Sequence, residues 1–269
     1  MTRAALTEQI RAKKSLLCVG LDSDINKIPT KFKSEKDPIF AFNKMVIDAT
    51  ADYAIAYKPN IAFYECLGPA GWESLQRTME YIPKGIFTIA DAKRGDIGNT
   101  ASMYAKTFFE YLNFDSVTLS PYMGKDSISP FLEYKDKWAI MLGVTSNPGA
   151  LDFQFQPIAG GSDRLFEKVV KHAISWENSD RIMFVAGATR GEVLASVRAA
   201  APNHFFLVPG VGAQGGSLSE VCQHSLTDFG GLLINSSRGI IYAGDDKSVE
   251  AAAKTLQLEM KEILTQKGL

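Results

Sequence analysis

The sequence predicts an α/β fold in the form of a single (β/α)8 barrel, and three observations favour this fold. Short apolar runs rich in β-branched residues alternate with segments whose apolar residues recur at helical spacing. The runs are apolar on both faces, which is typical of parallel strands that are covered by helices on each side. The chain has 269 residues, which suits one barrel domain over 1–269, and no linker divides it.

About eight apolar runs are the candidate strands, and amphipathic segments lie between them. An open doubly wound sheet is the alternative, and the number of runs favours a closed barrel. We expect strands at 16–22, 54–60, 87–93, 116–121, 139–146, 182–189, 205–212 and 231–237. We expect helices at about 5–14, 38–50, 71–82, 101–112 and 248–264.

One long connection has a composition that is typical of a loop. The segment 147–163 follows the fifth predicted strand and is rich in Gly, Pro and Gln. Long loops without secondary structure in compact domains are often covers over binding sites. We therefore predict that this segment is a lid over the mouth of the barrel.

Composition and charge exclude several classes of protein. The 29 basic and 30 acidic residues give a formal net charge of -1, so the chain has no broad basic field for a nucleic acid or a membrane surface. Cys18, Cys66 and Cys222 are widely spaced, which indicates a reducing cytoplasm and not a disulfide framework. No segment has the length of a membrane span or the apolar core of a signal peptide. We expect a cytoplasmic protein with a local small-molecule site.

Charged residues end the first three predicted strands, where barrels carry their reactive groups. Asp22 ends the first strand, Lys58 the second, and Asp91 and Lys93 the third, with Asp96 close behind. Period-two spacing places Asp91 and Lys93 on one face, close enough to pair. Each residue alone is compatible with a turn, a cap or a solvated strand end. Three consecutive charged ends favour a shared site, because buried charge is costly unless it is paired.

A phosphate site is predicted after the seventh and eighth strands, where barrels commonly bind phosphate. Gly210, Gly212 and Gly215 let backbone N–H groups approach an anion, and Arg238 can clamp two oxygens. Tight turns without a ligand are the alternative for these glycines. They also match the G-x-G-x-x-G dinucleotide motif. That interpretation is disfavoured, because they follow the seventh strand and no acidic residue stands at the required distance.

Several kinds of catalytic site are missing from the sequence. His172, His204 and His224 fall singly on or beside predicted helices, away from the strand ends, which argues against a metal-binding or acid–base role. The chain has neither a G-x-S-x-G elbow nor a Walker loop. We therefore expect no metal site and neither hydrolase nor kinase chemistry.

The segment DAKRGDIGNTA, with Lys58 before it and VPGVGAQGG after the seventh strand, resembles the orotidine 5'-phosphate decarboxylase family. The resemblance extends over nearly the whole chain, and SPYMGKDSI and SNPGA are similar to the longer bacterial branch. The family motif Asp-x-Lys-x-x-Asp-Ile-x-x-Thr is matched by Asp91, Lys93, Asp96, Ile97 and Thr100.

The resemblance implies cofactor-free decarboxylation of orotidine 5'-phosphate to uridine 5'-phosphate, the last step of de novo UMP synthesis, in a homodimer. Lys93 would be the electrostatic stabiliser and proton donor within a catalytic charge network of Lys58, Asp91, Lys93 and Asp96. Asp22 would bind the ribose, Ser146 the pyrimidine, and Gln214 both ring and phosphate. Asp96, Ile97 and Thr100 would reach the partner subunit's site. The implied substrate-binding residues are Asp22, Ile97, Thr100, Ser146, Gly212, Gln214, Ser237 and Arg238.

Two rival functions remain open. A related decarboxylase acts on a 3-keto-gulonate phosphate, shares the third-strand motif and needs magnesium. Lys58 disfavours that activity, because a lysine at this strand end would repel the cation. A non-catalytic barrel that binds a phosphate ligand is the second rival, and the intact charge set disfavours it.

Overall fold

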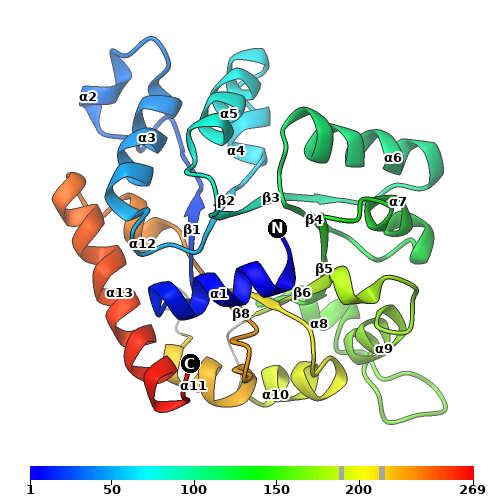
Figure 1. Cartoon of the computed structure of the whole chain (residues 1–269). Coiled ribbons are helices and arrows are strands. Elements are labelled where there is room, and N and C mark those ends of the chain that lie inside the picture. The colour runs from blue at the N-terminus through cyan, green and yellow to red at the C-terminus, as the bar shows by residue number, and fades with distance from the viewer. Residues whose placement is uncertain (188–190, 212–215) are drawn as a thin grey trace.

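The computed structural model describes residues 1–187, 191–211 and 216–269. Eight parallel strands pair there in chain order, and β8 returns to β1 to close the barrel (Figure 1). The predicted single (β/α)8 barrel is therefore confirmed, and the open sheet is excluded. The strands are β1 (Leu17–Leu21), β2 (Ala56–Pro59), β3 (Phe87–Arg94), β4 (Ser116–Leu119), β5 (Trp138–Val144), β6 (Ile182–Ala186), β7 (Phe206–Pro209) and β8 (Leu232–Ser236).

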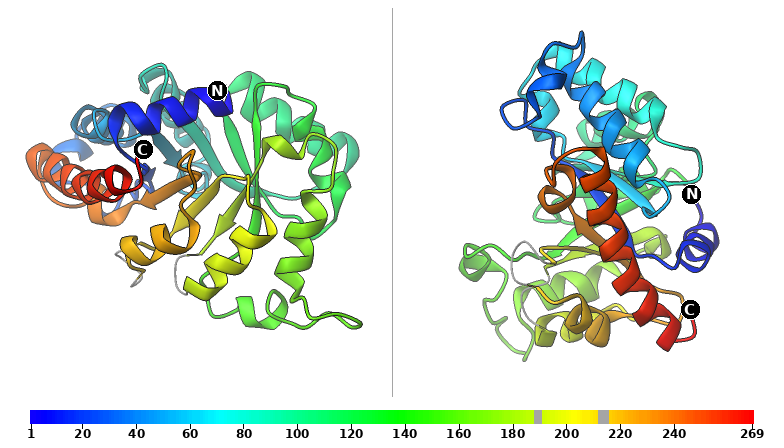
Figure 2. Two further views of the ribbon diagram at one scale, coloured as in Figure 1. Left: turned by 60° about the horizontal axis from the view of Figure 1, so that its bottom comes forward. Right: turned by 90° about the vertical axis from the view of Figure 1, so that its left-hand side faces the viewer.

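Helices surround the barrel and cover the outer face of the strands (Figures 1 and 2). None of the described helices is both long and apolar enough to cross a bilayer. The longer helices are α1 (Arg3–Lys13), α3 (Pro38–Thr50), α5 (Pro69–Tyr81), α6 (Gly98–Lys106), α9 (Leu165–Ala173), α10 (Gly191–Ala200), α11 (Leu218–Ser225) and α13 (Asp246–Gln266). The short ones are α2 (Thr30–Lys33), α4 (Ala62–Glu65), η1 (Thr107–Tyr111), η2 (Lys125–Ser127), α7 (Ser129–Leu132), α8 (Ala150–Phe153), η3 (Ser179–Arg181) and α12 (Arg238–Ile241).

The helix predicted at 101–112 has two parts. It begins as α6 and continues as η1, which is a π-helix. In its last turn the Leu112 N–H donates to the Thr107 carbonyl at 3.0 Å, a bond between residues five apart. The predicted boundaries are close to the observed ones, but a change from α to π spacing has no signal in the apolar pattern.

The strands are buried on both faces, as their apolar runs predict. Every residue of β1, β2, β4 and β6 is buried. In β3 the first four residues are buried, whereas the last four, from Asp91 to Arg94, are partly buried or exposed. The third strand therefore leaves the core at its carboxyl end, where its charged residues begin.

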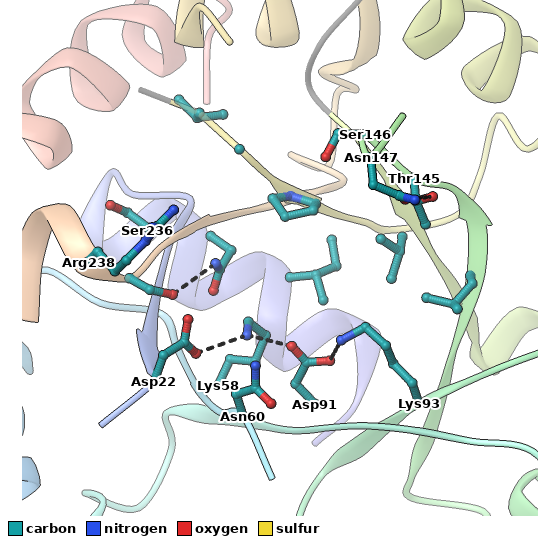
Figure 3. Close-up of a pocket in the computed structure, with 18 residues that line it drawn as sticks. Asp22, Lys58, Asn60, Asp91, Lys93, Thr145, Ser146, Asn147, Ser236 and Arg238 are labelled. Carbon is teal, nitrogen blue, oxygen red and sulfur yellow. Dashed lines mark hydrogen bonds and ion pairs between the residues drawn. The ribbon is translucent and has the colours of Figure 1, made fainter. Parts of the chain in front are cut away.

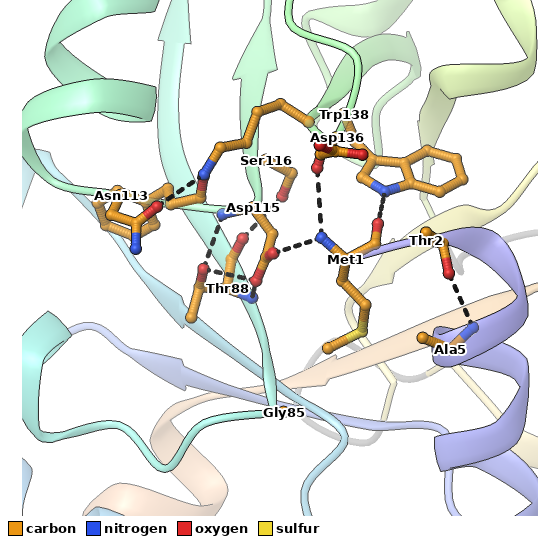
Figure 4. Close-up of polar contacts among 12 residues, drawn as sticks. Met1, Thr2, Ala5, Gly85, Thr88, Asn113, Asp115, Ser116, Asp136 and Trp138 are labelled. Carbon is orange, nitrogen blue, oxygen red and sulfur yellow. Dashed lines mark hydrogen bonds and ion pairs between the residues drawn. The ribbon is translucent and has the colours of Figure 1, made fainter.

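Helix α1 and the N-terminus close the opposite end of the barrel (Figure 4). The Met1 ammonium donates to Asp115 Oδ1 at 2.8 Å, and the Trp138 indole N–H donates to the Met1 carbonyl at 2.7 Å. The backbone N–H and the hydroxyl of Thr88 both donate to Asp115 Oδ2 at 3.0 Å. Because Asp115 precedes β4 and Trp138 begins β5, these contacts cover the amino ends of the strands. The carboxyl ends remain available for a site.

The connection 147–163 contains α8 and a turn that is closed by an isolated bridge between Pro157 and Arg164. Gln154 ties it to the end of β5, because its amide oxygen accepts from the Thr145 N–H and its NH2 donates to the Thr145 hydroxyl, both at 2.8 Å. Phe153 is 68% exposed beside this anchor. The segment is thus attached at its base and carries an exposed aromatic side chain.

Candidate active site

A cavity of about 310 Å³ opens at the carboxyl ends of the strands. Residues from the ends of β1, β2, β3, β5, β6, β7 and β8 line it, as expected of a barrel site. Eight predicted site residues lie together in this lining: Asp22, Lys58, Asp91, Lys93, Ser146, Gly210, Ser237 and Arg238.

Four charged side chains of alternating sign form a row across one wall of the cavity (Figure 3). Lys58 Nζ lies 3.8 Å from Asp22 Oδ1 and 2.8 Å from Asp91 Oδ2. Lys93 Nζ lies 2.5 Å from Asp91 Oδ1. The Lys58 side chain is 5% exposed and Asp91 11%, whereas Lys93 is 51% exposed. The inner members are fixed in the wall, and the last ammonium group reaches into the open cavity.

The charges in this row stabilise one another. Burial alone would raise the pKa of Asp91, but the ammonium groups of Lys58 and Lys93 outweigh it and hold this pKa well below its usual range. Burial alone would lower the pKa of Lys58, but the carboxylates of Asp91 and Asp22 outweigh it and raise this pKa. Asp91 is therefore anionic and Lys58 cationic at neutral pH.

A bulge at the end of β3 presents Lys93. Ala90 pairs with Val117 of β4 and Arg94 pairs with Leu119, so residues 91–93 lie opposite Thr118 alone. Lys93 has φ of 48°, in the left-handed region that non-glycine residues seldom adopt. The predicted pairing of Lys93 with Asp91 is present, but regular strand alternation is the wrong reason for it. The bulge turns the chain so that the two side chains meet.

Uncharged and cationic groups at the end of β8 line the cavity next to β1, which Asp22 follows. The Asn235 amide donates to Ser237 Oγ at 3.3 Å, and Arg238 follows at the start of α12. Gly20 of β1 makes room for this arrangement, since a Cβ at that position would lie 1.8 Å from Ser237 Oγ. Ser237 and Arg238 are therefore held at the mouth by a close approach of β1 and β8.

Apolar side chains line the remaining part of the cavity. Leu142, Val185 and Leu207 come from β5, β6 and β7, and the polar residues 145–147 also line the cavity. The cavity thus has a fixed charge array, a cationic group at its mouth and an apolar face. This arrangement suits a flat, partly apolar ligand that carries an anionic group at one end.

The sequence profile described as "Orotidine 5'-phosphate decarboxylase / HUMPS family" matches residues 15–254. The chain belongs to this family. The orotidine 5'-phosphate decarboxylase of Bacteroides fragilis (strain YCH46) is 55% identical over 265 residues, which are 97% of this chain and 96% of the relative. The orotidine 5'-phosphate decarboxylase of Christiangramia forsetii is 56% identical over 267 residues, 97% of each chain.

Solved structures of family members superpose on the whole barrel. The OMP decarboxylase of Leishmania donovani superposes with a TM-score of 0.86 at 42% sequence identity. The matched region is 98% of this chain and 99% of the Leishmania chain. The UMP synthase of the same organism gives a TM-score of 0.86 at 43% identity, over 96% of this chain and 55% of the longer one. The resemblance predicted from the motifs is therefore confirmed at the level of the family.

Three predicted residues of the family motif lie outside the cavity of their own chain. Asp96 accepts a hydrogen bond from the Ile97 N–H at 2.8 Å, directly before α6. Ile97 is 52% exposed, and Thr100 is also exposed. Three further predicted residues, Gly212, Gln214 and Gly215, lie outside the described residues.

The three histidines lie outside the cavity lining, on or beside helices as predicted. His172 lies on α9 and His224 on α11, while His204 is buried with Nε2 3.1 Å from the Ser179 carbonyl oxygen. Burial lowers the pKa of His204. In the ranges that the structure describes, no three His, Cys, Asp or Glu side chains are grouped as metal ligands would be.

Sequence reasoning missed several residues of the site region, among them two asparagines, a glycine and a threonine. Asn60 and Asn235 line the cavity at the ends of β2 and β8, and the strand-end rule that selected their charged neighbours would have found them. Gly20 and Thr118 had no such signal, because their importance arises from contacts across strands.

Proposed function

We propose that this chain decarboxylates orotidine 5'-phosphate to uridine 5'-phosphate, which makes it a carbon–carbon lyase. The observation that carries the proposal is the alternating row of Asp22, Lys58, Asp91 and Lys93 at the carboxyl ends of adjacent strands. The names of the close relatives agree with this activity.

The chemistry requires a fixed positive charge. When the C6–carboxylate bond breaks, carbon dioxide leaves and the electron pair stays in an in-plane orbital at C6, where conjugation with a carbonyl or a cofactor cannot drain it. In the proposed mechanism the Lys93 ammonium faces this carbanion, stabilises it and then donates the proton that replaces the carboxylate. Asp91 holds the ammonium from 2.5 Å, so the charge is in place before the bond breaks.

The remaining wall supplies binding energy. In this proposal Arg238 and Ser237 bind the phosphate together with Gly212 and Gln214, and Ser146 faces the pyrimidine. Asp22 Oδ1 is buried without a hydrogen-bond partner, which suits a ribose hydroxyl as its missing donor. Binding at the phosphate, far from C6, lowers the barrier if it helps close the site around the reacting ring.

We propose that the enzyme is a homodimer in which Asp96, Ile97 and Thr100 complete the partner subunit's site. An exposed apolar surface supports this assembly. Ile97 and Met103 are each 52% exposed, and Met123 is 46% exposed. Met123 borders the same segment, since its Cε would lie 3.7 Å from a Cβ placed on Gly95. Exposed apolar side chains that gather in this way are typical of an interface.

The connection 147–163 is proposed as a lid. Its support is its position, because Ser146 and Asn147 line the cavity and the segment begins there. Exposed Phe153 gives it an apolar side chain that could cover a bound ligand.

The cytoplasm is the proposed location, since Cys18, Cys66 and Cys222 are all free thiols.

An ultraviolet assay with orotidine 5'-phosphate, with and without a chelator, tests the function. We expect turnover that is unchanged by the chelator, because Lys58 places an ammonium group between Asp22 and Asp91 where a cation would otherwise bind. A requirement for magnesium would favour the keto-gulonate-phosphate type of activity. Binding of uridine 5'-phosphate without any turnover would favour the non-catalytic barrel.

Arg238→Ala should raise KM and lower kcat/KM, since the proposed partner of this guanidinium is the phosphate and not the reacting ring. A fall in kcat/KM of about 10- to 100-fold is expected for the loss of hydrogen bonds to a charged group. Added guanidinium should restore part of the activity. The control is Arg11→Ala, an exposed arginine on α1 at the other end of the barrel. If kcat/KM of Arg238→Ala equals that of the control, the phosphate binds elsewhere.

A further inference from the structure

Thr118 of β4 is the residue that faces the bulge carrying Asp91 and Lys93. Its Oγ1 accepts a hydrogen bond from the Lys93 backbone N–H at 2.9 Å. The same hydroxyl donates to Asp91 Oδ1 at 3.1 Å. Asp91 Oδ1 is also the atom that contacts Lys93 Nζ at 2.5 Å. One hydroxyl group therefore contacts both the backbone of the lysine and the carboxylate that orients its ammonium.

The rest of the bulge is fixed through its backbone carbonyls. The Ile61 N–H donates to the Asp91 carbonyl at 3.2 Å, and the Ser120 N–H donates to the Arg94 carbonyl at 2.8 Å. The Arg94 guanidinium Nη1 donates to the Ala92 carbonyl at 3.3 Å. These bonds set the path of the chain, but none of them touches the Asp91 carboxylate. A lysine with its backbone in the left-handed region persists only where the surrounding structure holds it there. The hydrogen bond from the Lys93 N–H to Thr118 Oγ1 supplies such a contact.

Thr118 is fully buried and does not line the cavity. It therefore acts on a ligand only through its two neighbours. We propose that Thr118 is a positioning residue whose hydroxyl fixes the Asp91 carboxylate and the Lys93 backbone, and so aims the Lys93 ammonium at the reacting carbon. This inference rests on the proposed function, because it assigns Thr118 a part in the same reaction.

Thr118→Val tests the hydroxyl while it keeps a β-branched side chain of nearly the same shape. We expect kcat to fall about 100-fold, the effect of misplacing a reacting group by roughly 1 Å. KM should change by less than about threefold, because binding groups at the mouth are untouched. Thr118→Ser keeps the hydroxyl and should recover most of the wild-type kcat.

Ser116→Ala is the matched control. Ser116 lies two residues earlier on the same strand, is also fully buried, and donates through its hydroxyl to the Thr88 carbonyl at 3.0 Å. Its loss removes a buried hydrogen bond between β4 and β3 that is outside the cavity. We expect a lower melting temperature and an unchanged kcat, so a general loosening of the sheet would be told apart from a loss of positioning.

Each outcome decides the inference. It is overturned if Thr118→Val keeps kcat within twofold of an active wild type, or if Ser116→Ala lowers kcat as much. If Thr118→Val does not fold, Thr118→Ala and Thr118→Ser replace it, and equal kcat values of these two variants overturn the inference.

If the wild type itself does not decarboxylate orotidine 5'-phosphate, the proposed function fails. Crystal structures of wild type and Thr118→Val then decide, and an unmoved Lys93 side chain overturns the positioning role.

Discussion

Lys93→Ala is expected to lower kcat by at least about 10⁴-fold while uridine 5'-phosphate still binds. The substitution removes a preorganised charge that faces the developing carbanion, an effect of about 10²- to 10³-fold. It also removes the proposed proton donor, which adds about 10²- to 10⁴-fold. The substitution leaves the residues proposed to bind the phosphate intact, and Arg238 follows β8, which does not pair with β3.

Single-turnover rates with orotidine 5'-phosphate and calorimetric titration with uridine 5'-phosphate measure the two effects separately. Lys261→Ala, an exposed lysine on α13, is the control for the loss of a positive charge and should be fully active. More than a tenth of the wild-type kcat in Lys93→Ala would rule out the role proposed for this ammonium group.

The charged row shows what a strand-end rule can predict. Asp22, Lys58 and Asp91 are far apart in the sequence, but each stands at the carboxyl end of a parallel strand. Because β1, β2 and β3 are neighbours in the barrel, their ends meet, and the three side chains lie within ion-pair distance. Apolar runs and helical spacing were sufficient to predict this topology, and the topology brings the charges together.

The local geometry was not predictable in the same way. The bulge at Lys93 and the hydroxyl of Thr118 arise from the register between β3 and β4, which leaves no periodic signal in either strand. The close contact of Gly20 with Ser237 likewise depends on how β1 meets β8. Asp96 is a different case, because it lies outside the cavity of its own chain. The family motif predicts that it completes the partner subunit's site, and one subunit alone does not test this role.

Mixing two inactive variants tests whether each site contains residues of both subunits. Lys58→Ala and Asp96→Ala homodimers should each be nearly inactive. Lys58→Ala removes the cation between Asp22 and Asp91, and Asp96→Ala removes one anion from every proposed site. In a heterodimer of the two, one site would collect both defects and the other would have neither. Each heterodimer should then have about half the wild-type activity.

Random exchange of equal amounts makes about half of the dimers heterodimers, so the mixture should recover about a quarter of the wild-type activity. Mass spectrometry of the intact dimers verifies the exchange.

Lys58→Ala mixed with Lys93→Ala is the matched control, since both lysines line one cavity of the same chain. Every site in that heterodimer keeps one defect, and no activity should return. If Asp96 acts within its own subunit, its mixture must behave like the control after verified exchange, and the shared site is then excluded. Recovery in the Asp96 mixture alone places this carboxylate in the site of the partner.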